Sequence, residues 1–83
     1  MNEPTTTKQL KKFRFVAPDI DVFEEFPTTR GAIADAMVAS YAGHTKLYRV
    51  LDDGTEELLY DSLKCKNMSI DSVLRWAKKS GKS

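Results

Sequence analysis

The sequence predicts a small α+β domain with the element order ββαββα. Three observations lead to this prediction: apolar residues alternate in four short segments, they follow helical spacing in two longer ones, and turn residues separate the segments. The simplest assembly is a four-stranded, mostly antiparallel sheet with two helices packed on one face.

The length and composition of the chain are those of one globular domain. It has 83 residues, of which 41% are hydrophobic and 30% charged. Residues 1–9 lack apolar periodicity, so we expect a flexible N-terminal tail there. The single domain is then expected over residues 10–80, with a short C-terminal tail over residues 81–83.

Two alternating segments near the N-terminus predict the first hairpin. In KKFRFVAP, Phe13 and Phe15 fall on the same side of a strand. The segment IDVFEEF follows after a short turn at Pro18 and Asp19. Its apolar alternation is interrupted by a glutamate, so we expect a strand that either is exposed on one side or carries a bulge.

The segment FPTTRGAIADAMVASYAG predicts the first helix. Thr28 or Thr29 suits its N-cap, because a hydroxyl there accepts a hydrogen bond from a free amide of the first turn. We expect Gly43 to end the helix in the left-handed conformation. Apolar residues four positions apart predict the stripe that faces the sheet: Ile33, Met37 and Tyr41.

The segment HTKLYRVLDDGTEELLYDS predicts the second hairpin. Asp53-Gly54 favours a two-residue type I′ turn. That turn would pair Tyr48 with Leu59, and Leu47 with Tyr60. The side facing the helices would then carry Leu47, Leu51, Leu58 and Tyr60, with Arg49 and Glu56 near enough to pair.

The last predicted helix runs from about Ile70 to Lys79. Ser69 suits its N-cap, and Asp71 falls in the first turn, where the helix dipole favours an acid. Four apolar residues share one face of this helix and are expected to be buried: Ile70, Val73, Leu74 and Ala77.

Charge is distributed unevenly along the chain, although its net value is only +1. Residues 1–17 and 62–83 are basic, whereas residues 18–61 hold ten acids against three bases. If the two ends meet in the fold, they form one basic patch. The candidates for a nucleic-acid contact are the cations of the two ends: Lys11, Lys12, Arg14, Arg75, Lys78, Lys79 and Lys82.

Aromatic and cationic residues of the second hairpin and last helix are candidates for contact with a partner protein. On a helical wheel Trp76 lies at the edge of the buried stripe, so the sequence leaves open whether it completes the core or anchors an interface. The protein-interface candidates are Tyr48, Arg49, Arg75, Trp76 and Lys79.

No group of residues in the sequence forms a catalytic or metal-binding motif. The one histidine, His44, is expected in an exposed loop, and as a general base it would need a nucleophile, an orienting carboxylate and a pocket. With the one cysteine, Cys65, far along the chain, a zinc site lacks ligands. We therefore expect no enzymatic activity, no cofactor, and no catalytic or metal-binding residues.

The sequence contains no membrane or secretion signal. No apolar run approaches the roughly 20 residues of a transmembrane helix, and the N-terminus lacks the apolar centre of a secretory signal. A single cysteine cannot form an internal disulfide, which favours a reducing, cytoplasmic location.

These observations predict a small non-enzymatic binding module that acts through protein–protein contact. Two alternatives stay open: an accessory nucleic-acid-binding protein that uses the basic N- and C-terminal segments, and a small phage or mobile-element protein that inhibits or modifies a host factor. Another protein is the expected partner. Nucleic acid or a second copy of the chain, forming a homodimer, are the other candidates, and no membrane contact is expected.

Overall fold

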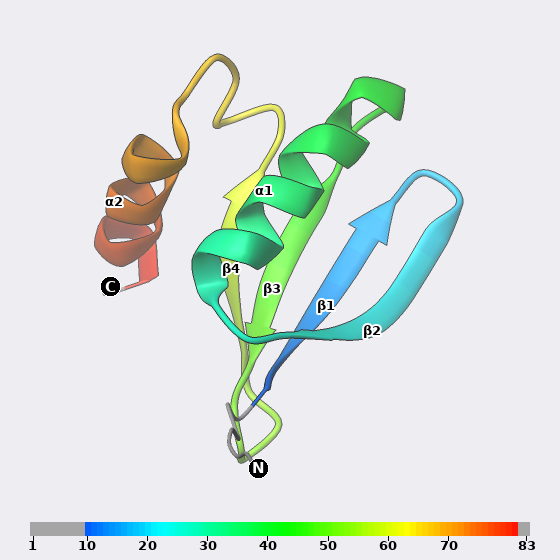
Figure 1. Ribbon diagram of the computed structural model, residues 1–83, viewed down its shortest axis with the longest axis vertical. Helices are drawn as coiled ribbons and strands as arrows, with labels where there is room; N and C mark the ends of the chain where they lie inside the picture. Colours follow the sequence, from blue (N-terminus) through cyan, green and yellow to red (C-terminus); the bar gives the residue numbers. More distant parts are fainter. Residues whose placement is uncertain (1–9, 82–83) are drawn as a thin grey trace, which may run out of the picture.

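The computed structural model describes residues 10–81, so the tail predicted at residues 1–9, and residues 82–83, lie outside the described part. The predicted order ββαββα is confirmed (Figure 1). The elements are β1 (Lys11–Ala17), β2 (Ile20–Phe26), α1 (Thr29–Ala39), the 3₁₀ turn η2 (Ser40–Ala42), β3 (Lys46–Val50), β4 (Glu56–Asp61) and α2 (Ile70–Gly81).

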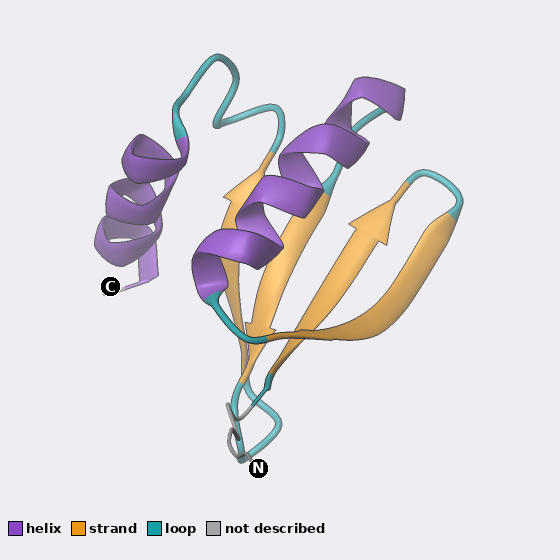
Figure 2. Cartoon of the chain, in the orientation of Figure 1, coloured by secondary structure: helices purple, strands orange, loops and turns teal. Residues whose placement is uncertain are grey.

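The sheet has the strand order β2-β1-β3-β4, and every neighbouring pair is antiparallel. Strands β2 and β3 therefore run in the same direction, and α1 crosses from one to the other with β1 between them (Figure 2). Helix α1 packs against all four strands, whereas α2 packs against β4 and α1. Both helices share one core, as predicted, and no described element covers the other face of the sheet.

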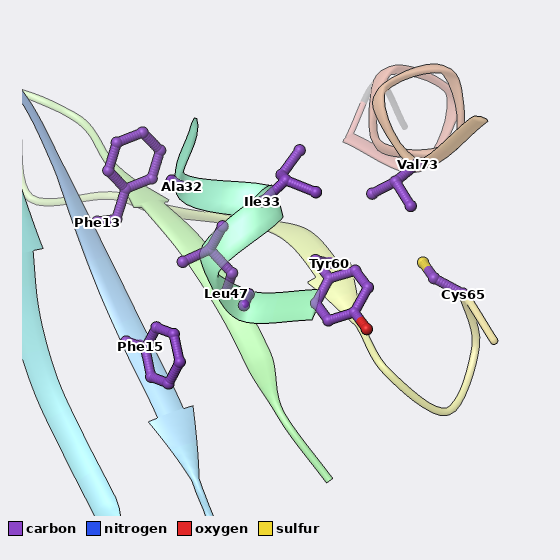
Figure 3. Packing of buried hydrophobic residues seen from close by; sticks show 9 residues of the cluster. Phe13, Phe15, Ala32, Ile33, Leu47, Tyr60, Cys65 and Val73 are labelled. Atoms are coloured by element: carbon purple, nitrogen blue, oxygen red, sulfur yellow. The ribbon is translucent and has the colours of Figure 1, made fainter. Parts of the chain in front are cut away.

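The core lies between the sheet and the two helices (Figure 3). Small side chains on α1 let this helix lie close to the strands, and burying a residue as large as Phe13 contributes roughly 1.5–3 kcal/mol. Phe13 also meets Phe26 edge to face, with ring centroids 5.8 Å apart. The buried cluster comprises Phe13, Phe15, Ala32, Ile33, Ala36, Leu47, Tyr60, Cys65 and Val73.

Helix α1 begins as predicted and ends differently. The Thr28 hydroxyl accepts a hydrogen bond from the Gly31 amide at 3.0 Å, so Thr28 is the N-cap. Tyr41 is not part of the buried stripe: the chain tightens into η2, which turns this side chain outward until it is 91% exposed.

The prediction of a left-handed cap at Gly43 is also wrong. This residue has φ 149° and ψ −174°, outside the left-handed helical region. A Cβ there would lie 2.7 Å from Cγ of Pro18. Gly43 is therefore suited to the close approach of the α1–β3 connection to the turn between β1 and β2.

The second hairpin has a longer turn than predicted and a β-bulge. The loop is Asp52-Asp53-Gly54, in which only Gly54 has a positive φ, so this is not a type I′ turn. The Asp53 carboxylate accepts a hydrogen bond from the Thr55 amide at 2.9 Å. The register of β4 is therefore shifted near the loop, where Tyr48 pairs with Leu58 instead of Leu59.

The bulge restores the predicted pairing of Leu47 with Tyr60 and decides which side each leucine faces. Leu59 packs against the core, while Leu58 shares the other face of the sheet with Tyr48. The expected Arg49–Glu56 pair is absent from the described residues, because Glu56 pairs across the strands with Val50 and binds Arg14 instead.

The first hairpin follows one of its two predicted forms. Strands β1 and β2 pair without a register shift over their full lengths, so there is no bulge. Val22 and Phe26 pack against the core, and Phe23 points the opposite way with 56% of its side chain exposed. Strand β2 is thus the variant that is exposed on one side.

Candidate functional site

Helix α2 presents one apolar and one cationic face. The Ser69 hydroxyl accepts a hydrogen bond from the Ser72 amide, which confirms the predicted N-cap. Val73 and Ala77 are buried, with Ile70 and Leu74 half-buried beside them, as the periodicity predicted. Three exposed cations at positions i, i+3 and i+4 define what we call the cationic face of α2: Arg75, Lys78 and Lys79.

Trp76 belongs mainly to the apolar face of α2. Its side chain is half-buried and packs against the core cluster. Of the two interpretations that the sequence left open, the structure therefore supports a core role. Lys79 lies three positions beyond Trp76 on the same side of the helix, so Trp76 adjoins one edge of the cationic face.

The cations of the cationic face form no ion pair with any side chain of residues 10–81. The Arg75 guanidinium makes one long contact, 3.4 Å, with the Ser72 hydroxyl. The one acid on this helix, Asp71, is bound by Arg30 at 2.7 Å. That hydrogen bond, together with the charge of Arg30, lowers the pKa of Asp71.

Two further exposed cations lie in the connection before α2. Lys64 and Lys66 flank the buried Cys65 and also form no ion pair in the described part of the chain. Lys78 and Lys79 complement the negative end of the helix dipole, as cations do at many helix C-termini. Arg75, in the middle of the helix, has no such structural role.

The face of the sheet opposite the helices, which we call the uncovered sheet face, carries three apolar or aromatic side chains and one arginine in its central row. A central row runs across the four strands through paired residues: Phe23, Arg14, Tyr48 and Leu58. Beside this row Val16 pairs with Asp21 and Lys46. On its other side the pairs are Lys12 with Glu25 and Val50 with Glu56.

Two of the three cations of the uncovered sheet face, Arg14 and Lys12, have partners within the chain. The Arg14 guanidinium donates two hydrogen bonds to the Asp21 carboxylate, at 2.8 and 2.6 Å, and a third to Glu56 at 3.2 Å. These bonds raise the pKa of Arg14 and lower that of Asp21. The Lys12 ammonium lies 5.0 Å from the centre of the Phe23 ring.

One end of the fold carries a histidine–aspartate pair beside a cleft. His44 Nε2 lies 2.8 Å from Asp61 Oδ1, and the Leu63 amide donates to the same oxygen. Burial alone would raise the pKa of Asp61, but the hydrogen bonds from His44 and Leu63 outweigh it and lower the pKa. The cleft has a volume of about 570 Å³, and its lining includes Tyr41, His44, Leu63 and Cys65.

The lining of this cleft includes the Ser62 hydroxyl and the Cys65 thiol. The Ser62 hydroxyl accepts a hydrogen bond from the Thr45 amide. Cys65 is only 2% exposed, and burial raises the pKa of its thiol, which disfavours the reactive thiolate. No group of three or more potential metal ligands occurs within the described residues.

The residues proposed from the sequence fall into separate regions. Arg75, Lys78 and Lys79 come together on α2, whereas Tyr48, Lys12 and Arg14 lie on the uncovered sheet face.

The Arg49 guanidinium lies 5.7 Å from the Phe13 ring on the helix side. Lys11 Nζ donates to the Pro27 carbonyl, and Lys82 lies outside the described residues. The cations of β1 and α2 therefore do not join into one basic patch.

Sequence reasoning missed two features that depend on contacts between distant residues. The His44–Asp61 pair joins residues 17 positions apart, and Arg14 meets Glu56 across 42 positions. Neither pair follows a local spacing rule. The exposure of Phe23 had a signal, since the alternation of β2 placed it opposite Val22 and Phe26.

None of the helices within residues 10–81 has the length and apolar character needed to cross a membrane. Comparison with protein-family models, with curated proteins and with solved structures finds no match to this chain. Interpretation of its function therefore depends on its own geometry and charge.

Proposed function

We propose that this protein is a non-enzymatic binding module, and that the cationic face of α2 docks on an acidic segment of a partner protein. One observation carries the proposal: Arg75, Lys78 and Lys79 are exposed together and form no ion pair with any described residue, while Arg14 and Arg30 are bound by acids of the same chain. A cation that has no ion pair within its own chain can bind a partner protein without first losing an existing contact.

The surroundings of this face also favour an acidic protein segment. Trp76 keeps a smaller part of its side chain accessible at the edge of the cationic face, and tryptophan and arginine are enriched at interface centres. The opposite side of the helix is already buried in the core. Contact would therefore use the outward side of α2, which α1 and β4 hold in place.

A non-enzymatic role is consistent with the geometry at the His44–Asp61 pair. Asp61 could orient the imidazole, but a base also needs a nucleophile within reach. The Ser62 hydroxyl is engaged by the Thr45 amide, and the Cys65 thiol is buried. We therefore assign this pair a role in holding the β3 and β4 ends together.

Affinity capture from the native host, with nuclease treatment, tests the proposal. The test variant carries Arg75→Gln, Lys78→Gln and Lys79→Gln. The matched control carries Lys11→Gln, Lys12→Gln and Lys46→Gln, which removes the same amount of charge from the sheet. We expect a protein that the wild type and the control retain and the test variant loses.

Titration of the purified partner then measures the effect. We expect the test variant to bind roughly 10- to 100-fold more weakly, as for the loss of a few charged contacts at an interface. Circular dichroism should show that all three proteins are folded. Equal weakening in the test variant and the control would contradict the proposal, because it would indicate nonspecific charge attraction.

Nucleic acid is the second candidate, and the same observation favours it. Lys64 and Lys66 add two exposed cations in the connection that leads into α2, and phosphates attract cations in the same way as carboxylates. With five cations, the logarithm of the affinity should fall with the logarithm of salt concentration with a slope no steeper than about −4 to −5. Titration of labelled duplex and single strands at two salt concentrations tests whether nucleic acid is the partner. Absence of binding at low salt would exclude nucleic acid.

A further inference from the structure

We propose that two copies of the chain associate through the uncovered sheet face. This inference concerns a different surface from the cationic face of α2, so it does not depend on the proposed function. Its first support is the central row of the face, in which three of the four side chains are apolar or aromatic. Phe23 is 56% exposed, and beyond Arg14 the row continues through Tyr48 and Leu58, which are half-buried. Accessible aromatic side chains next to an arginine are typical of the surface that a protein interface buries.

The second support is the charge balance around this row. The face carries three accessible acids and three bases, while the buried Asp61 next to Lys46 is bound by His44. A surface of one sign would repel its own copy, whereas this face is balanced, and Glu25 and Lys46, which form no ion pair with any described residue, can each meet an opposite charge of the other copy. The six residues are Asp21, Glu25, Glu56, Lys12, Arg14 and Lys46.

The third support is that the centre of the face is held in position before any contact forms. Arg14 is clamped by Asp21 and Glu56, and Lys12 lies over Phe23. Side chains that are already ordered lose less conformational entropy on association. The acids beside the central row also make this face unsuitable for phosphates, and its bases make it a poor site for a strongly basic protein.

The inference also agrees with the position of the helices. Both helices cover the opposite face of the sheet, so two copies can meet sheet to sheet without moving either helix. The cationic face of α2 would remain accessible in such a pair.

Sedimentation velocity of the full chain from about 1 µM to about 1 mM tests this proposal, because that range spans weak self-association. We expect the wild type to pass from monomer to dimer as the concentration rises. Phe23→Asp should raise the dissociation constant at least about tenfold, since it replaces the most exposed apolar side chain of the row with a charge. Val38→Asp is the matched control: Val38 is 65% exposed on α1, and this variant should dimerise within about twofold of the wild type.

A second measurement needs no substitution. Dilution of the isotope-labelled wild type should shift the amide NMR signals of Phe23, Tyr48 and Leu58, and leave those of Arg75 and Lys79 unchanged. A wild type that stays monomeric at the highest concentration overturns the proposal. So does a dimer that Phe23→Asp and Val38→Asp weaken equally, or one whose dilution shifts are centred on α2.

Discussion

The uncovered sheet face and the cationic face of α2 both carry three cations, but they use them differently. On the sheet, Arg14 is bound by Asp21 and Glu56, and Lys12 lies over an aromatic ring. On α2, none of the cations forms an ion pair within the described residues. The difference teaches that the number of charges on a surface says less about its role than whether those charges already have partners.

This difference has an energetic consequence. A group with partners inside the chain contributes to folding, and removing it leaves those partners unsatisfied. An exposed group without partners contributes little to folding and remains available for binding. The loss of folding stability should therefore increase with the number of contacts that a substitution removes. It should be largest on the buried side of α2 and smallest on its cationic face.

Trp76→Ala should have the largest effect on stability. It removes an aromatic side chain that packs against the core, and we expect a loss of roughly 2–3 kcal/mol, below the value of about 3–5 kcal/mol for a fully buried aromatic. Urea denaturation followed by circular dichroism measures this. Trp76→Phe, which keeps most of the packing, is the control. A change within about 0.5 kcal/mol for the alanine variant would show that Trp76 is not a core residue.

Asp61→Ala should cause the second-largest loss of stability, because Asp61 is the most buried charge that has partners. The substitution removes the hydrogen bonds to His44 and to the Leu63 amide, and we expect a loss of roughly 1.5–3 kcal/mol. His44→Ala is the comparison, since it removes only one of these bonds and should cost less. Equal losses in the two variants would mean that the bond to the Leu63 amide contributes nothing.

Acid should destabilise the protein through the same group. The pKa of Asp61 is lowered in the folded state, so its contribution is fully present above its unfolded pKa of about 4 and is lost as the pH falls through the lower folded value. When the urea midpoint of unfolding is measured at successively lower pH, it should therefore begin to decrease once the pH is below about 4. Asp61→Asn should flatten that fall, and an unchanged pH profile in this variant would assign the acid sensitivity to other carboxylates.

Arg14→Gln tests the paired charges of the sheet at the solvent surface. It breaks the bonds to Asp21 and Glu56, but water screens all three groups. We expect a lower urea midpoint with a smaller shift than for Asp61→Ala, and the shift should shrink at high salt. A loss as large as that of Asp61→Ala would show that this ion-pair cluster is a main support of the hairpin.

Lys78→Gln with Lys79→Gln should have the smallest effect on folding. Neither ammonium has a partner among the described residues, and loss of the favourable dipole contact should change stability by no more than about 0.5 kcal/mol. The same pair of substitutions should weaken binding to the proposed partner. A marked loss of stability would remove the distinction between the two surfaces.

Local patterns in the sequence were sufficient to predict most of the secondary structure. Alternation located all four strands, Thr28 and Ser69 were recognised as N-caps, and the spacing of Val73 and Ala77 predicted the buried side of α2. These features depend on a few neighbouring residues, so they can be read from short segments. The cations of α2 could be predicted as exposed for the same reason.

Tertiary structure decided which residues meet across the sheet and which face each one occupies. The three-residue loop at Gly54 placed Leu58 on the uncovered sheet face, because shifting the register by one residue reverses the side that each side chain faces, and the bulge at Leu59 restored the predicted register from Tyr60 onward. The strand order kept the cations of β1 away from those of α2. Whether a charge has a partner depends on such long-range contacts, and this property, which separates the two surfaces, could not be read from the sequence.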